Sequence, residues 1–98
     1  MLTKIYDKKP RGKELRKIRS IAEKLKPKII IGKKGLTDEI IKNIKNKLKK
    51  EKVLKIRILR NAYFGKERKE YLISLCKKLI ENSIKVAGIK GNTIVVYS

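Results

Sequence analysis

The stretch that decides the fold is Leu25-Lys26-Pro27-Lys28-Ile29-Ile30-Ile31-Gly32-Lys33-Lys34-Gly35-Leu36-Thr37. A proline pushes the residue before it out of the α region, so a preceding helix has to end at or just before Lys26. Three β-branched residues between Pro27 and Gly32 predict a short buried strand. Glycines at 32 and 35 favour a tight turn, and Thr37 is a good N-cap for a helix. The stretch therefore predicts a helix, a strand, a turn and a second helix in succession.

Hydrophobic periodicity extends this pattern in both directions. Apolar residues recur at three- and four-residue steps over 15–25, over 40–48 and over 72–80, which predicts three amphipathic helices, the third starting near Lys66. Residues 53–59 alternate instead, with Lys55 and Arg57 on the outer face of a half-buried strand. Two further β-rich runs, 84–89 and 93–97, are joined by Lys90-Gly91-Asn92, which indicates a hairpin.

The element order is therefore helix–strand–helix–strand–helix–strand–strand. Strands separated by helices imply right-handed crossovers and parallel pairing, and the final hairpin adds an antiparallel pair. Each helix has one apolar face, so we predict a two-layer α/β fold, a four-stranded mixed sheet with the helices on one face. Residues 1–12 are predicted to be a basic lead-in that ends at Pro10-Arg11-Gly12, and residues 13–98 to be a single domain.

The composition restricts the possible functions. Among 98 residues, 29 are Lys or Arg and 9 are Asp or Glu, which gives a formal net charge of +20. The chain has no His, which excludes His-based acid–base catalysis and disfavours zinc sites. Few carboxylates make a carboxylate metal cage improbable, so we expect no enzyme activity and no cofactor. The single Cys76 lies on the apolar face of the third helix, and we interpret it as a buried structural thiol.

A charge of +20 exceeds what solubility needs and predicts a polyanionic partner. Membrane surfaces and nucleic acids both qualify on composition alone. The longest apolar run, Ile94-Val95-Val96-Tyr97, is too short for a membrane span, and no export segment is visible, so we expect a cytoplasmic protein with no membrane partner.

The turn Gly32-Lys33-Lys34-Gly35 is the sharpest candidate for a binding element. A G-x-x-G loop before a helix N-terminus can clamp a nucleic-acid backbone, as in KH domains, because its amides and lysines face the phosphates. The alternative is a plain strand-to-helix turn, and the residues alone leave the two readings equal. The spacing is that of neither a P-loop nor a dinucleotide-binding loop.

Tyr63 and Phe64 lie in a loop rich in cations, between Arg60 and Lys66. Aromatic residues among cations suit base stacking. Alternatively they close the end of the core, which is the interpretation we favour for Phe64, while Tyr63 stays open between the two.

The combination of L-K-P at 25–27 with G-K-K-G-L-T at 32–37 resembles the CRM domain (chloroplast RNA splicing and ribosome maturation), or YhbY-like, family. The strand Val53-Leu54-Lys55-Ile56-Arg57-Ile58 and the chain end from Gly91 to Tyr97 are similar to that family too. The chain departs from the family at Lys52-Val53-Leu54, in a longer hairpin, and at Ser98, where an arginine is usual. The resemblance implies a fold like the C-terminal domain of bacterial translation initiation factor three, and RNA binding in ribosome maturation.

We therefore expect a non-catalytic, monomeric RNA-binding protein that acts on ribosomal precursor or other structured noncoding RNA, with no small-molecule substrate. The alternatives are a structural protein of the mature ribosome and a double-stranded DNA-coating protein of the chromatin type. The residues expected to contact RNA are Gly32, Lys33, Lys34, Gly35, Thr37, Arg16, Arg19, Lys55, Arg57 and Tyr63.

Overall fold

Local sequence signals set most element ends in the computed structural model, which describes residues 12–98. The Thr37 side chain caps a helix by accepting a hydrogen bond from the Ile40 amide, and α1 has ended before Pro27. The lead-in predicted over residues 1–12 lies outside the described residues except for Gly12, where α1 begins. The elements are α1 (Gly12–Lys24), β1 (Ile29–Ile31), α2 (Asp38–Leu48), β2 (Val53–Ile58), the short 3₁₀ helix η2 (Arg60–Tyr63), α3 (Arg68–Glu81), β3 (Lys85–Lys90) and β4 (Thr93–Tyr97).

The four strands form one mixed sheet in the order β1-β2-β4-β3. β1 runs parallel to β2 after the α2 crossover, with Ile29 opposite Ile56. β4 is antiparallel to both of its neighbours, and Ile56 faces Ile94 across the β2–β4 pair. The predicted element order, the mixed sheet and the α/β class are confirmed.

The larger core lies between one face of the sheet and helices α2 and α3. The alternating residues Leu54, Ile56 and Ile58 of β2 point into it and are at most 1% exposed. Ile44 of α2 and Leu79 of α3 meet them from the helix layer and are fully buried. Burying an aliphatic side chain of this size stabilises the fold by about 1.5–3 kcal/mol, so this face contributes most of the stability.

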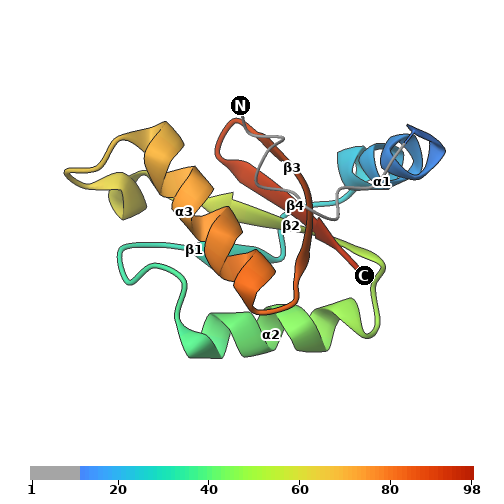
Figure 1. Cartoon of the computed structure of the whole chain (residues 1–98), viewed down its shortest axis with the longest axis horizontal. Helices are drawn as coiled ribbons and strands as arrows, with labels where there is room; N and C mark the ends of the chain where they lie inside the picture. The colour runs from blue at the N-terminus through green and yellow to red at the C-terminus, as the bar shows by residue number, and fades with distance from the viewer. Residues whose placement is uncertain (1–11) are drawn as a thin grey trace.

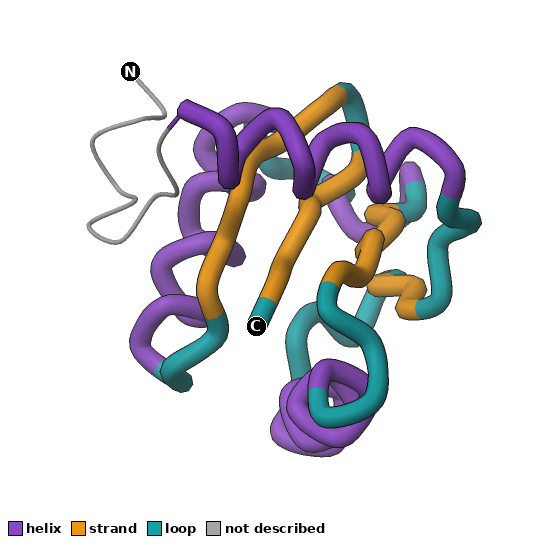
Figure 2. The backbone as a smooth tube through the Cα atoms, turned by 90° about the vertical axis from the view of Figure 1, so that its right-hand side faces the viewer, coloured by secondary structure: helices purple, strands orange, loops and turns teal. Residues whose placement is uncertain are grey.

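Helix α1 packs on the opposite face of the sheet (Figure 1; Figure 2 turns the same arrangement by 90°). Its Ile18 and Ala22 form a second, smaller core with Val53, Ala87 and Tyr97. The prediction that all helices share one face is therefore wrong for α1. The physical reason is strand alternation: Val53 and Tyr97 occupy the outward positions of β2 and β4, so the outer face is apolar at this end and basic farther along.

Candidate nucleic-acid interface

Three loops meet at one edge of the sheet, because β1 and β2 are parallel and β4 starts where β2 ends. The Leu59 amide donates to the Ile31 carbonyl over 2.9 Å, and the Ile58 amide donates to the Asn92 carbonyl over 2.8 Å. These bonds place the loop after β2 next to the turn after β1 and next to the tip of the β3–β4 hairpin. We call this region, residues 32–37, 59–67 and 91–92, the loop edge.

The GKKG turn is closed by its own backbone. The Gly35 amide donates to the Gly32 carbonyl over 3.0 Å, and Gly35 has φ +74°, which an L side chain rarely adopts. Lys33 and Lys34 are exposed at the tip of the turn. The Gly35 amide is thus occupied by the turn, and the two lysine side chains give the turn its positive charge.

The start of α2 adds little attraction for an anion. Thr37 uses its side-chain oxygen to cap the helix, accepting from the Ile40 amide over 3.2 Å. Asp38 and Glu39 stand in the first turn, where they favour the helix dipole and repel phosphate. Positive charge at this turn therefore comes from Lys33 and Lys34, and the first turn of α2 carries two carboxylates; contact of the turn with phosphate stays a prediction.

Two tyrosines connect the three loops from inside. A Cβ atom on Gly35 would lie 3.4 Å from the Tyr71 hydroxyl, so the turn rests closely on that side chain. The Tyr71 ring meets the Tyr63 ring edge-on at 5.6 Å, and the Lys66 ammonium lies 4.5 Å from the Tyr71 ring centre. Burial raises the pKa of both tyrosines, and the charge of Arg68 opposes this for Tyr63.

Tyr63 is half-buried against the larger core, and its hydroxyl donates to the Asn92 side chain. This placement makes it a link between loops, and a direct contact of Tyr63 with RNA stays a prediction. Phe64 is 86% exposed, so the prediction that it closes the core is wrong. Because η2 turns Ala62 and Tyr63 inward, the next side chain projects from the loop edge. The only sequence signal for this was its position among cations, directly before Gly65.

The remaining predicted residues lie on the face of the sheet that α1 partly covers. Arg16 and Arg19 are exposed on α1, and Arg57 is exposed on β2. Lys55 is half-buried, and its ammonium donates to the Leu25 carbonyl over 3.3 Å, which ties the end of α1 to the sheet. Arg19 and Lys55 line one pocket, whereas Arg16 and Arg57 do not line it. The structure thus divides the ten predicted residues between the loop edge and the α1 face.

Neither a metal centre nor a membrane span is found in the described part of the chain. Residues 12–98 contain no group of three or more His, Cys, Asp or Glu side chains that could hold a metal ion. None of the helices in this range is long and apolar enough to cross a membrane. The candidate site is therefore built from cations, one exposed aromatic ring and backbone turns.

The chain is similar to a known protein family, to a curated protein and to a solved structure. The model of the CRS1/YhbY (CRM) domain matches residues 11–98. The Bacillus subtilis protein YqeI, named as a probable RNA-binding protein, is 33% identical over 87 residues, which cover 88% of this chain and 84% of YqeI. The solution structure of a hypothetical Staphylococcus aureus protein, described as a candidate RNA-binding protein, is similar with a TM-score of 0.68 and 28% identity, over 89% of this chain and 85% of that one.

Proposed function

The chain belongs to the CRS1/YhbY (CRM) domain family, and we propose that it is a non-catalytic RNA-binding protein whose loop edge holds structured RNA. Its proposed target is ribosomal precursor RNA, which it binds as a monomer in the cytoplasm. The names of its relatives in Bacillus subtilis and Staphylococcus aureus support RNA as the partner. A net charge of +20 supports a polyanion in general.

The observation that carries the proposal is the arrangement of the loop edge. Lys33 and Lys34 project from a turn that rests on Tyr71, and Phe64 projects from the neighbouring loop. The lysines bind phosphates, and the exposed ring stacks on an unpaired base. Because hydrogen bonds join the loops, the backbone segments that carry these groups are held next to each other.

The test compares two double charge reversals. Lys33→Asp with Lys34→Asp changes the loop edge, and Lys49→Asp with Lys50→Asp makes the same change in net charge just beyond the far end of α2. Diffuse attraction weakens both variants equally, whereas a clamp weakens the first variant more, by about 1–3 kcal/mol. The measurement is a binding titration against one structured RNA, with circular dichroism as the folding control. Equal losses would contradict the clamp.

Salt dependence tests whether phosphates are the ligand. Contact with about six phosphates gives a slope of log affinity against log salt of roughly −4 to −5. A slope near zero, or equally tight binding to acidic lipid vesicles at the same salt concentration, would overturn RNA as the partner.

Sedimentation of cell extracts through a gradient tests the target. A ribosome-maturation protein travels with precursors of the subunits, and a structural ribosomal protein travels with mature particles. Crosslinking followed by sequencing of the bound RNA then identifies the contact. Predominant recovery in mature ribosomes would replace the maturation role by the structural one.

A further inference from the structure

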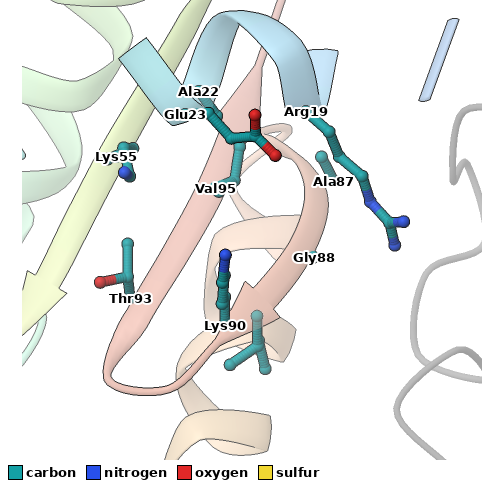
Figure 3. Close-up of a pocket in the computed structure, with 10 residues that line it drawn as sticks. Arg19, Ala22, Glu23, Lys55, Ala87, Gly88, Lys90, Thr93 and Val95 are labelled. Atoms are coloured by element: carbon teal, nitrogen blue, oxygen red, sulfur yellow. The ribbon is translucent and has the colours of Figure 1, made fainter. Parts of the chain in front are cut away.

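A pocket of about 650 Å³ lies on the α1 face of the sheet (Figure 3), and neither Lys33 nor Lys34 is among its lining residues. It is bounded by α1 on one side and by β2, β4 and β3 below. Its volume is within the range of pockets that hold small organic ligands, roughly 300–1,000 Å³.

The floor of the pocket is apolar. Ala22 and Ala87 are buried at its edge, and Val95 is half-buried beside them. A Cβ atom built on Gly88 would meet no atom within 4 Å, so the missing side chain leaves open space above the strand. Gly88 also follows the irregularity in the β3–β4 register. A floor of small side chains next to bare backbone accommodates a planar ring.

The rim of the pocket is charged with both signs. Arg19 from α1, Lys55 from β2 and Lys90 from the end of β3 supply three cations. In Figure 3 the Lys90 side chain extends from β3 toward α1, and the Glu23 side chain extends from α1 toward Val95. The two side chains therefore enter the pocket from opposite sides. Within residues 12–98 the single ion pair joins Lys28 and Glu51, so Glu23 faces the pocket with no cation within 4.0 Å among these residues.

Glu23 is the informative residue, because a carboxylate that faces the pocket opposes the binding of a phosphate-rich ligand. An ionised carboxylate only accepts hydrogen bonds, and it accepts two in parallel from a planar pair of N–H donors. Among the four RNA bases, guanine alone offers two adjacent donors, N1–H and N2–H, on its Watson–Crick edge. Proteins that recognise unpaired RNA form hydrogen bonds with the Watson–Crick edge of a base that is splayed out of the helical stack.

We propose that this pocket binds one unpaired guanine nucleotide of the RNA, with the base on the Gly88 floor, its Watson–Crick edge at Glu23 and its phosphates at Arg19 and Lys90. This inference rests on the proposed function, since it names a subsite for the same RNA. The loop edge and the pocket are neighbours in the sheet. Arg57, at the end of β2 that leads into the loop edge, is paired with Thr93 of β4, and Thr93 lines the pocket. A strand of RNA held at the loop edge reaches the pocket along this exposed face.

Nuclear magnetic resonance tests the pocket directly. The protein is titrated with guanosine, adenosine, cytidine and uridine monophosphates and with inorganic phosphate, each alone. We expect the amides of Ala87, Gly88 and Thr93 to shift most with the guanosine nucleotide and to saturate at its lowest concentration. Equal shifts with inorganic phosphate would show a simple anion site, and the absence of shifts at these amides would show no site. Either result would overturn the proposal.

Matched variants test the role of the carboxylate in RNA binding. Two RNA hairpins are used that differ only in a guanine or an adenine in the loop. Glu23→Gln should reduce the preference for the guanine hairpin about tenfold, since it removes the acceptor pair. Glu81→Gln, at the end of α3 on the opposite face of the sheet, makes the same change in charge and should leave the preference unchanged.

The two variants also separate charge from recognition. Each raises the net charge by one, so general attraction to phosphate strengthens or holds in both, and only Glu23→Gln loses selectivity. Gly88→Val, which fills open space at an ordinary strand position, should abolish the guanine preference in a protein that circular dichroism shows to be folded.

Failure of this inference is distinguishable from failure of the proposed function. RNA binding that falls with the Lys33 and Lys34 reversals but never distinguishes guanine from adenine would overturn the pocket alone. Shifts with guanosine monophosphate in a protein that binds no structured RNA would overturn the proposed function and keep the nucleotide site.

Discussion

The Tyr63 hydroxyl donates a 3.1 Å hydrogen bond to the side-chain oxygen of Asn92, residues that lie 29 positions apart in the sequence. The bond joins the loop after β2 to the tip of the β3–β4 hairpin. The same tyrosine meets Tyr71 edge-on, and Tyr71 supports the GKKG turn. A small number of contacts therefore fixes the relative positions of three loops that are separate in the chain.

Removing this hydrogen bond should loosen the hairpin tip. We expect Tyr63→Phe to lower the free energy of unfolding by about 0.5–1.5 kcal/mol, the usual net value of one such bond. Urea titrations of Tyr63→Phe, of Asn92→Ala and of the double variant give the coupling between the two side chains. Strictly additive losses would mean that the bond contributes nothing to the folded state.

Phe64→Ala should weaken RNA binding without weakening the fold. The side chain is 86% exposed, so we expect its loss to change the unfolding free energy by less than about 0.5 kcal/mol. Loss of base stacking should reduce affinity for RNA with an unpaired loop by about 1–3 kcal/mol. Phe64→Trp, which retains a stacking surface, serves as the control and should bind normally. A large loss of stability would restore the interpretation of Phe64 as a core residue.

Cys76→Ala should affect the fold and leave RNA binding unchanged. Cys76 is 0% exposed in the larger core, so trimming it should cost about 1–2 kcal/mol of stability. Urea denaturation measures this loss, and a titration with RNA measures affinity below the unfolding transition. Weaker binding by the folded variant would show that α3 does more than support the loop edge.

Ser83→Gly should stabilise the protein. Ser83 has φ 65° where the chain leaves α3, and its amide donates to the Ile80 carbonyl in the turn that closes the helix. Glycine adopts this conformation without steric cost, so we expect a gain of about 0.5–1 kcal/mol. Ser74→Gly, the same substitution at an exposed position inside α3, should instead lose about 0.5–1 kcal/mol. Changes of the same sign in both variants would contradict the conformational explanation.

Periodicity predicted the helices, the strands and their order, because each apolar face had to be buried. It did not predict which face of the sheet α1 covers. Lys55 and Arg57 indicated a solvated outer face on β2, yet Val53 on the same face is 2% exposed. The apolar residues of the outer face, Val53, Ala87 and Tyr97, come from three different strands. Only the register that pairs Val53 with Tyr97 brings them together under α1.

Only the part of the candidate site that depends on local sequence was predicted. Lys33 and Lys34 were found because a glycine turn has a recognisable spacing, and their exposure follows from the turn. The orientation of Phe64 depends on the 3₁₀ helix η2, which the hydrophobic periodicity of the sequence does not predict. The pocket near Gly88 depends on β3 and α1 meeting across the sheet, and these elements are distant in the sequence.

The division of the interior into two cores has a consequence for local unfolding. Among residues 12–98, the core on the α1 side contains five buried residues and the core on the other side contains seventeen. The Lys55 ammonium also connects the α1 side to the sheet through the Leu25 carbonyl. Segments with fewer buried apolar contacts open at lower free energy than the whole molecule does. We therefore expect helix α1 to detach first, and its amides to exchange with solvent deuterium before those of α3 and β2. Each such opening removes one wall of the pocket while the loop edge stays assembled.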